Sequence, residues 1–311
     1  MKKLLSMFLL VFLIVGLVAC SSNEEKVDHE ALAEDGSLGV FYEVSEGDNT
    51  VYLFGSVHIG NEEMYPMHPK VEEAYSKASV LGVEVDINNI NQMELAQAMT
   101  SIAIYQDGTS LKDHLSTEVY DEVVSIGASV GLEEFLIAMY KPAFVSDLIT
   151  NYYAEQNGYS AEYGIDQYFL DRAAEDEKVV EPLESLQSQL EIMTILEEET
   201  QIKMLEDMLA NKDNYSQELD TLVNAWVTGD EQTFESMRAA EEYDSEDYLR
   251  YKKALSDDRD QEMANKVEGF LQSNEHDTYF VVVGTLHLVG ENSIVDVLRE
   301  KGYEVKSGFG Q

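Results

Sequence analysis

The same short frame, Gly-x-x-His, occurs near both ends of this sequence. Gly55 and His58 lie in "GSVHIG", and Gly284 and His287 lie in "GTLHLVG". Each frame directly follows an apolar run that is typical of a buried strand, "VYLF" in the first case and "YFVVV" in the second. Imidazole is a common metal ligand and a general base near neutral pH. We therefore take His58 and His287, two of only six histidines in the chain, as candidates for one shared site.

A third apolar run, "VLGVEVD" (80–86), ends in the two carboxylates Glu84 and Asp86. Alternate residues of a strand share a face, so we expect both to lie on the same side. Two imidazoles and a carboxylate form a set that binds a divalent metal ion and leaves positions open for water. The sequence therefore predicts a metal site made by His58, His287 and Glu84. In a metal-free alternative, a histidine acts as general base and Glu84 orients it. Two buried histidines that donate to backbone carbonyls would also produce the repeated frame.

The elements that must position these residues are concentrated at the two ends of the chain. We expect strands at 39–44, 50–54, 80–86, 178–184, 278–283 and 303–308, and mainly helices at about 91–178 and 186–272. The turn "SEGDN" predicts a hairpin between the first two strands. This order predicts an α/β fold, in which a central, mainly parallel sheet is built from N- and C-terminal strands and carries a large helical insertion. Ligands of such sheets bind at the carboxyl ends of the strands.

The N-terminus has the pattern of an exported lipoprotein. Lys2 and Lys3 precede an apolar run (4–18) that is shorter than a comfortable membrane span, and "LVAC" places a small residue before Cys20. We expect residues 1–19 to be a signal peptide, 20–37 a tether lipidated at Cys20, and 38–311 a single domain. The predicted location is the extracytoplasmic face of the cell membrane. A transmembrane anchor with an incidental cysteine is the alternative.

Composition excludes several functions. The formal net charge is −41, with 61 acidic and 20 basic residues, so a nucleic acid is not an expected partner. Cys20 is the only cysteine, which leaves none for a disulfide or a thiol nucleophile. The frame G-x-S-x-G occurs once, as "GASVG" (127–131), but it lies in a stretch with a helical pattern and not between a strand and a helix, so a serine hydrolase of that type has no support.

Several motifs in the same order make the chain resemble the TraB/GumN family, which includes the Tiki proteins. The resemblance covers about residues 38–307 and rests on "YLFGSVHIG", "VLGVEVD", "GIDQYFLDRA", "VVEPLES", "AWVTGDEQTF", "DDRDQEMANKVEGFL" and "TYFVVVGTLHLVGENSIVDVLREKGYEV". It implies a fold similar to that of erythromycin esterases and ChaN-like haem-binding lipoproteins. Tiki proteins are described as metal-dependent proteases that act on secreted signals, and bacterial relatives are linked to peptide-pheromone shutdown.

The resemblance also implies roles for individual residues. His58 and His287 match the two motif histidines, and Glu84 matches the acidic residue of the strand between them. Arg259 matches a usual arginine, which would be available to hold a carboxylate or an oxyanion. Asp260 departs from the family pattern, in which asparagine is common, so its polar contacts are expected to differ.

Three further residues are candidates. Asp166 and Glu184 match family positions, Asp166 as a helix cap or as support for the site, and Glu184 as a residue that orients another. His68, which precedes a proline near the first motif, is a candidate to support the site from behind.

Together these observations predict a lipid-anchored extracytoplasmic hydrolase, specifically a metal-dependent peptidase that uses Mn²⁺, Co²⁺ or Zn²⁺. A metal-bound water would attack a peptide carbonyl, Asp86 or Glu184 would shuttle the proton, and Arg259 would stabilise negative charge. The expected partners are a peptide or protein substrate and the membrane, reached through Cys20. Two alternatives are a non-enzymatic lipoprotein that binds a peptide or haem, and a metal-free esterase-like hydrolase.

Overall fold

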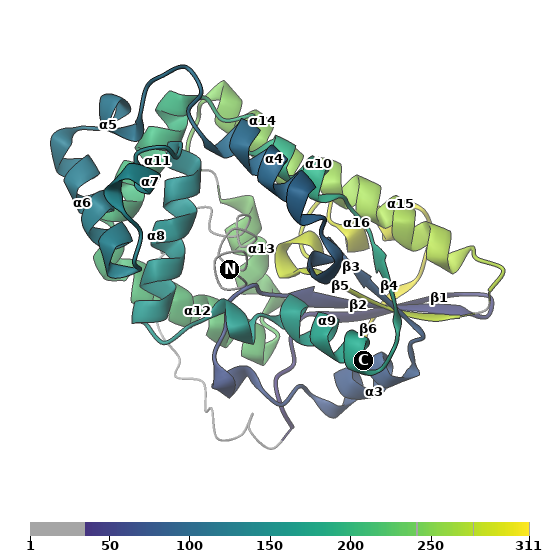
Figure 1. The fold of residues 1–311 in the computed structure, drawn as a ribbon. Helices are drawn as coiled ribbons and strands as arrows, with labels where there is room; N and C mark the ends of the chain where they lie inside the picture. Colours follow the sequence, from purple (N-terminus) through teal and green to yellow (C-terminus); the bar gives the residue numbers. More distant parts are fainter. Residues whose placement is uncertain (1–34, 241, 276, 311) are drawn as a thin grey trace.

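A computed structural model of the chain describes residues 35–240, 242–275 and 277–310. The predicted signal peptide, Cys20 and most of the tether lie outside these residues. The described part contains a six-stranded sheet in the order β4-β3-β5-β2-β1-β6 (Figure 1). Its strands are β1 (Phe41–Glu46), β2 (Asn49–Ser56), β3 (Val80–Val83), β4 (Val179–Pro182), β5 (Thr278–Gly284) and β6 (Val305–Ser307).

The sheet is mainly parallel, as the sequence predicts. β4, β3, β5 and β2 are neighbours and run in the same direction, whereas β1 pairs antiparallel with both β2 and β6. β1 and β2 form the predicted hairpin, and Gly47 in its turn has a φ of +59°, a conformation that glycine adopts without strain. Because β2 and β5 pair directly, the two Gly-x-x-His frames begin in the last residues of neighbouring strands.

Helices cover both faces of this sheet. α3 (Pro69–Lys77) and α9 (Ile165–Glu175) lie below it in Figure 1, and α15 (Arg259–Leu271) and α16 (Ile294–Glu300) lie above it. Beneath the sheet an aromatic cluster fills the core, with Phe54 and Phe280 packed against Phe169 of α9 and Tyr75 of α3. This double covering explains why β2, β3 and β5 are almost continuously apolar.

The remaining helices form the predicted insertion, most of it to the left of the sheet in Figure 1. Its first part contains α4 (Gln92–Ala103), α5 (Leu111–His114), α6 (Thr117–Ser129), α7 (Glu134–Ile137) and α8 (Pro142–Gln156). Its second part contains α10 (Leu186–Ile192), α11 (Glu198–Ala210), α12 (Tyr215–Thr228), α13 (Glu231–Ala239), α14 (Glu246–Lys253) and the π-helical turn η5 (Ala254–Asp258). The insertion has apolar clusters of its own, the largest of which joins α5, α6, α8 and α11.

Two details of the fold concern the sequence-based predictions. The predicted strand 80–86 ends at Val83, and the chain then turns into the short helix η2 (Ile87–Asn89), so Glu84 and Asp86 do not share a strand face. No helix in the described part of the chain is both long enough and apolar enough to span a bilayer.

Candidate functional site

The carboxyl ends of four neighbouring parallel strands carry the candidate residues. Glu184 follows β4, Glu84 follows β3, His287 follows β5 and His58 follows β2, so their order along the edge is that of the strands. Beyond the strands, the backbone N–H of Glu184 donates to the carbonyl of Glu84 at 2.9 Å, which extends the β3–β4 pairing into the site. The topology therefore brings residues that are up to 229 positions apart to one edge of the sheet.

A close backbone approach accompanies the first frame. A Cβ atom added at Gly55 would lie 2.7 Å from Oγ1 and 3.1 Å from Cα of Thr285. Thr285 in turn donates its hydroxyl to the carbonyl of Ser56 at 2.9 Å. Glycine is therefore required at position 55 because the ends of β2 and β5 meet there without space for a side chain.

His58 is held by Asp166. The Nδ1 atom of His58 lies 2.6 Å from Oδ2 of Asp166, and the hydroxyl of Ser56 donates to Oδ1 of the same carboxylate at 2.8 Å. α9 is anchored beside them because the N–H of Ile165 donates to the carbonyl of Val57 at 3.0 Å. Asp166 lies in the first turn of α9 but does not cap it, since the N-cap residue is Gly164. Of the two roles considered for Asp166, the structure thus supports contact with the site.

His287 has a matching partner from another helix. Its Nδ1 atom forms a hydrogen bond with Oδ1 of Asp260, a fully buried residue of α15. The other oxygen of Asp260 lies 2.7 Å from the guanidinium of Arg238, which also donates to the carbonyl of Leu286 at 2.6 Å. Asp260, noted as a departure from the family pattern, is thus the residue that fixes the ring of the second motif histidine.

Between the histidines and β4, a buried network joins two carboxylates through Arg259. The guanidinium donates to Oε2 of Glu84 at 2.5 Å and, with Nε and Nη2, to Glu184 at 2.7–3.1 Å. Gln189 of α10 donates to both carboxylates, at 3.1 Å to Glu84 and 3.0 Å to Glu184. The other oxygen of Glu84 accepts from the N–H of Gly284 at 2.6 Å. The contacts of Arg259 are therefore made to the chain's own carboxylates rather than kept for a ligand.

Electrostatics in this network follow from its burial. Burial alone would raise the pKa of Glu84, but the charge of Arg259, followed by those of His287 and His58, lowers it to about 2. Burial alone would lower the pKa of His58, but the charge of Asp166 and its hydrogen bond raise it to about 9. Glu84 is therefore anionic at neutral pH, and in the metal-free protein His58 carries a proton.

The fit of a metal ion depends on which ring and carboxylate atoms remain available. In both imidazoles Nδ1 contacts an aspartate, and among the described residues neither Nε2 has a hydrogen-bond partner. Histidines that bind metals usually have this arrangement, because the second partner fixes the ring and its tautomer. Nε2 of His287 lies 3.8 Å from Glu84, whose two oxygens accept from Gly284, Arg259 and Gln189.

The histidines therefore fit a metal better than Glu84 does. Across residues 35–240, 242–275 and 277–310, no three His, Cys, Asp or Glu side chains are grouped as a metal site. The metal role predicted for His58, His287 and Glu84 remains a prediction.

Two predicted candidates have local structural roles. Asp86 is the N-cap of η2 and accepts hydrogen bonds from the N–H of Asn88 at 3.2 Å and the side chain of Asn89 at 2.6 Å. His68 is the N-cap of α3, accepts from the N–H of Lys70 at 3.2 Å and packs edge-on against Phe309. Of the two residues proposed to shuttle a proton, only Glu184 belongs to the buried network. A catalytic role for Asp86 or Glu184 stays a prediction.

Sequence reasoning did not identify Gln189, Arg238 or Ser56 as parts of the site. Gln189 and Arg238 lie on amphipathic helices of the insertion, where a polar residue is usually solvated. The only sequence cue for Ser56 is its position inside the first Gly-x-x-His frame.

Comparisons with known proteins give the family of the chain. The profile of the TraB/PrgY/gumN family matches residues 40–307. The uncharacterized protein YbaP of Escherichia coli (strain K12) is 24% identical over 257 residues, which cover 81% of this chain and 89% of that protein. Metalloprotease TIKI1 of Danio rerio is 39% identical over 56 residues, which are 18% of this chain and 11% of that protein.

An uncharacterized protein of Treponema pallidum (strain Nichols) is 20% identical over 308 residues, covering 94% of this chain and 90% of that protein. No solved structure gives a significant match.

Proposed function

Because the chain belongs to the TraB/PrgY/gumN family, we propose that it is a hydrolase, and more narrowly a metal-dependent peptidase. The observation that carries this proposal is the pair of imidazoles at neighbouring strand ends, each held through Nδ1 by its own aspartate. Within the described residues neither Nε2 makes a hydrogen bond, and that of His287 lies 3.8 Å from Glu84. The short similarity to proteins named Metalloprotease TIKI1 and Metalloprotease TIKI2 supports the same reading.

The residues of the chain have distinct tasks in this proposal. His58 and His287 would hold the ion, which when bound would supply an acidified water and polarise a substrate carbonyl. Asp166 and Asp260 keep the two rings in fixed orientations. Arg259 and Gln189 hold Glu84 beside His287. A carboxylate whose pKa is about 2 is a weak base, so the contribution of Glu84 is mainly electrostatic.

A second candidate function is a metal-free, esterase-like hydrolase. The pKa of about 9 at His58 favours it, because a protonated imidazole can donate to a leaving group at neutral pH. In this version Asp166 stabilises the imidazolium, and the anionic Glu84 contributes a negative potential beside it.

The test is cleavage of a peptide library by the full-length chain after treatment with EDTA and after loading with Mn²⁺, Co²⁺ or Zn²⁺, with metal content measured in parallel. We expect about one equivalent of metal in the wild type. His58→Gln and His287→Gln should each lose the metal and at least about 100-fold in cleavage. His68→Gln is the matched control, because His68 caps α3 and packs against Phe309.

Other results would separate the alternatives. Cleavage that survives EDTA would support the metal-free hydrolase. Peptide binding without cleavage, unchanged in Glu84→Gln, would support a capture protein and contradict both hydrolase proposals. No metal, no binding and no cleavage in folded protein would exclude the peptidase.

We also propose that the protein is attached to the extracytoplasmic face of the cell membrane through a lipid on Cys20. The "LVAC" sequence supports this location. Cys20→Ser should abolish incorporation of a radiolabelled fatty acid into the protein without changing its activity on peptides. Equal incorporation into wild type and Cys20→Ser would contradict a lipid anchor at this residue.

A further inference from the structure

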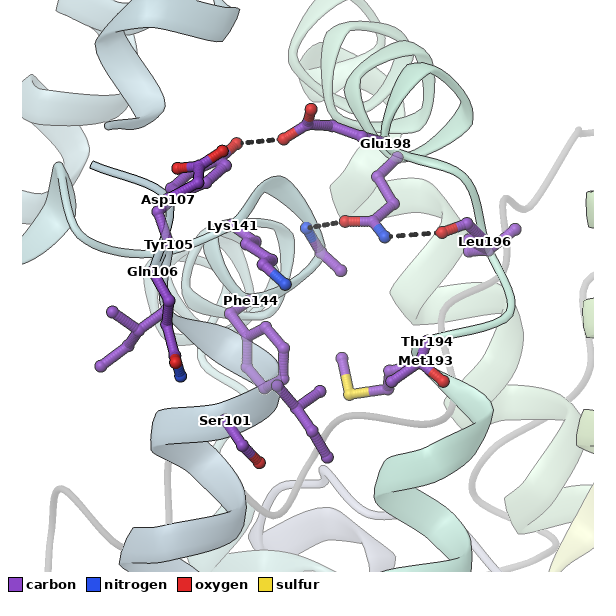
Figure 2. A pocket seen from close by; sticks show the side chains of 14 residues that line it. Ser101, Tyr105, Gln106, Asp107, Lys141, Phe144, Met193, Thr194, Leu196 and Glu198 are labelled. Carbon is purple, nitrogen blue, oxygen red and sulfur yellow. Dashed lines mark hydrogen bonds between the residues drawn. The ribbon is translucent and has the colours of Figure 1, made fainter. Parts of the chain in front are cut away.

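The helical insertion contains a cavity of about 510 Å³ that none of the residues at the strand ends lines. It is bounded by the end of α4, the segment 104–107, the start of α8, the segment that follows α10 and the start of α11. Its volume lies within the range of small-ligand sites, about 300–1,000 Å³. Figure 2 shows the side chains of Lys141, Phe144 and Met193 around the central space.

Most charged side chains that line this cavity already have partners within the chain. Glu198 accepts from the hydroxyl of Tyr105 at 2.5 Å and pairs with His114 at 3.1 Å. Asp107 accepts from the N–H and the hydroxyl of Thr109, at 2.9 and 2.6 Å. Both acids thus have partners within the chain.

The amide of Gln201 is engaged as well, since it accepts from the N–H of Ala143 at 3.3 Å and donates to the carbonyl of Leu196 at 2.9 Å.

Lys141 is different. Within residues 35–240, 242–275 and 277–310, its ammonium group has neither a hydrogen-bond acceptor nor an ion-pair partner. Its side chain points into the central space that Phe144 and Met193 also line (Figure 2). Phe144 and Met193, which line the same cavity, are almost completely buried. The cavity therefore offers a hydrogen-bond donor with a positive charge next to an apolar wall.

We propose that this cavity binds a carboxylate attached to an apolar group, with the carboxylate on Lys141 and the apolar group against Phe144 and Met193. The C-terminus of a peptide whose last residue is large and apolar has this chemistry, and so does a fatty acid. The peptide is the better match, because three oxygens of the lining can accept from its backbone N–H groups. They are those of Ser101, Gln106 and Thr194, whose own donors bond to backbone carbonyls.

The cavity is separate from the strand-end site, but α10 connects the two. Gln189 of α10 contacts Glu84 and Glu184, and Met193, the C-cap residue four positions later, lines the cavity. A ligand anchored on Lys141 would therefore lie against the segment that directly follows the helix supporting Glu84. The inference concerns binding alone, so it holds or fails independently of hydrolysis.

The test is a fluorescence-anisotropy titration of the full-length chain with a short N-acetylated peptide ending in Phe-Leu and carrying a free carboxylate. The same peptide with a C-terminal amide is the matched ligand, and mass spectrometry checks that the probe stays intact. We expect amidation to weaken binding about tenfold or more, as for the loss of a charged hydrogen bond.

The same two peptides are then titrated with variants of the protein. Lys141→Met should weaken binding of the free-carboxylate peptide by the same factor and leave binding of the amidated peptide unchanged, and Lys141→Arg should restore most of the affinity. Lys266→Met is the control, because it removes the same charge from an exposed position of α15. Ser101→Trp, which places a bulky side chain in the cavity, should abolish binding of both peptides while circular dichroism remains that of the folded protein.

Several results would overturn the proposal. One is equal affinity of the protein for the free and amidated peptides. Another is an equal loss of affinity for the free-carboxylate peptide in Lys266→Met and Lys141→Met. A third is tighter binding of a peptide that has a free N-terminal amine and an amidated C-terminus. Competition with dodecanoate decides the source of the carboxylate. Displacement of the peptide only at much higher concentration supports a peptide ligand, and displacement at lower concentration supports a fatty acid in the same cavity.

Discussion

Arg259 is the residue that makes two buried carboxylates compatible at the strand ends. Its side chain, like those of Glu84 and Glu184, is at most 8% exposed. Removing one member of a buried ion network leaves an uncompensated charge, which typically costs about 3–5 kcal/mol. We therefore expect Arg259→Leu to lower the free energy of unfolding by about this amount, measured by urea denaturation.

A surface pair provides the comparison for this prediction. Lys77 and Glu73 are 2.7 Å apart in α3, and both side chains are more than half exposed. Lys77→Met should lower stability much less than Arg259→Leu does, because solvent screens such pairs. If Arg259→Leu cost no more than Lys77→Met, the carboxylates would have to be neutral or hydrated, and the network described above would be wrong.

The raised pKa of Glu242, a residue outside the strand-end site, predicts that the stability of the protein depends on pH. Burial, followed by the charge of Glu218, raises the pKa of Glu242 from 4.5 to about 7, although Lys252 acts in the opposite direction. The folded state therefore holds this proton more tightly than the unfolded state does. The stability that it contributes is complete below pH 4.5 and is lost as the pH rises from 4.5 to 7.

Substitution of Glu242 tests whether stability falls in this pH range. Glu242→Gln should raise Tm more at pH 8 than at pH 4.5, measured by calorimetry, because the glutamine avoids burying a charge at the higher pH. Glu235→Gln, at an exposed position of α13, controls for the loss of one negative charge. An equal gain at both pH values would contradict a raised pKa at Glu242.

At the scale of elements, the junction of β2 and β5 sets the distance between the two histidine-bearing strand ends. Gly55→Ala would place a methyl group 2.7 Å from Oγ1 of Thr285. Overpacking of this kind usually costs about 1–3 kcal/mol. We expect that loss in urea denaturation, together with weaker activity of the strand-end site because the two ends must separate.

At a second glycine, substitution by alanine should stabilise the protein instead of destabilising it. A Cβ atom at Gly269, inside α15, would have no heavy atom within 4 Å. Gly269→Ala should stabilise the protein by up to about 1 kcal/mol, since alanine favours the helix. Destabilisation by both alanines would point to a general intolerance and not to contact between the strand ends.

The elements also show how far the sequence alone predicts the site. The apolar runs before Gly55 and Gly284 predict strands, and because these strands are parallel neighbours, the two histidines follow at one edge. The partners of the histidines are harder to predict. Asp166 and Asp260 lie on helices, and family motifs, not periodicity, drew attention to them.

The contacts of Gln189 and Arg238 depend on how the insertion packs against the sheet, which no local pattern encodes. The turn after Val83 was missed for a related reason. The run "VLGVEVD" continues the strand alternation, but Asp86 instead accepts the hydrogen bonds that begin η2.

At the scale of the whole molecule, the site exists only when both ends of the chain are folded together. The carboxylate of Glu84 accepts from Gly284, 200 residues away, and from Arg259, 175 residues away. The helical insertion lies between these partners in sequence, and α10 contributes Gln189 to the same carboxylates. A substitution that destabilises the insertion should therefore also weaken the hydrogen bonds that Gln189 of α10 makes to the strand-end carboxylates.

The charge of the whole molecule gives the last prediction. With a formal net charge of −41, the folded chain repels itself, and compaction brings these charges closer than they are in the unfolded chain. Salt shortens the screening length from about 30 Å at 0.01 M to about 3 Å at 1 M. We expect Tm to rise with NaCl by at least about 2 °C, equivalent to about 1 kcal/mol for a chain of this size. Most of the rise should occur below about 0.3 M, because screening saturates, and KCl should act equally. A steady rise to 1 M would indicate a general salt effect on burial, and a fall in Tm would mean that favourable ion pairs outweigh the repulsion.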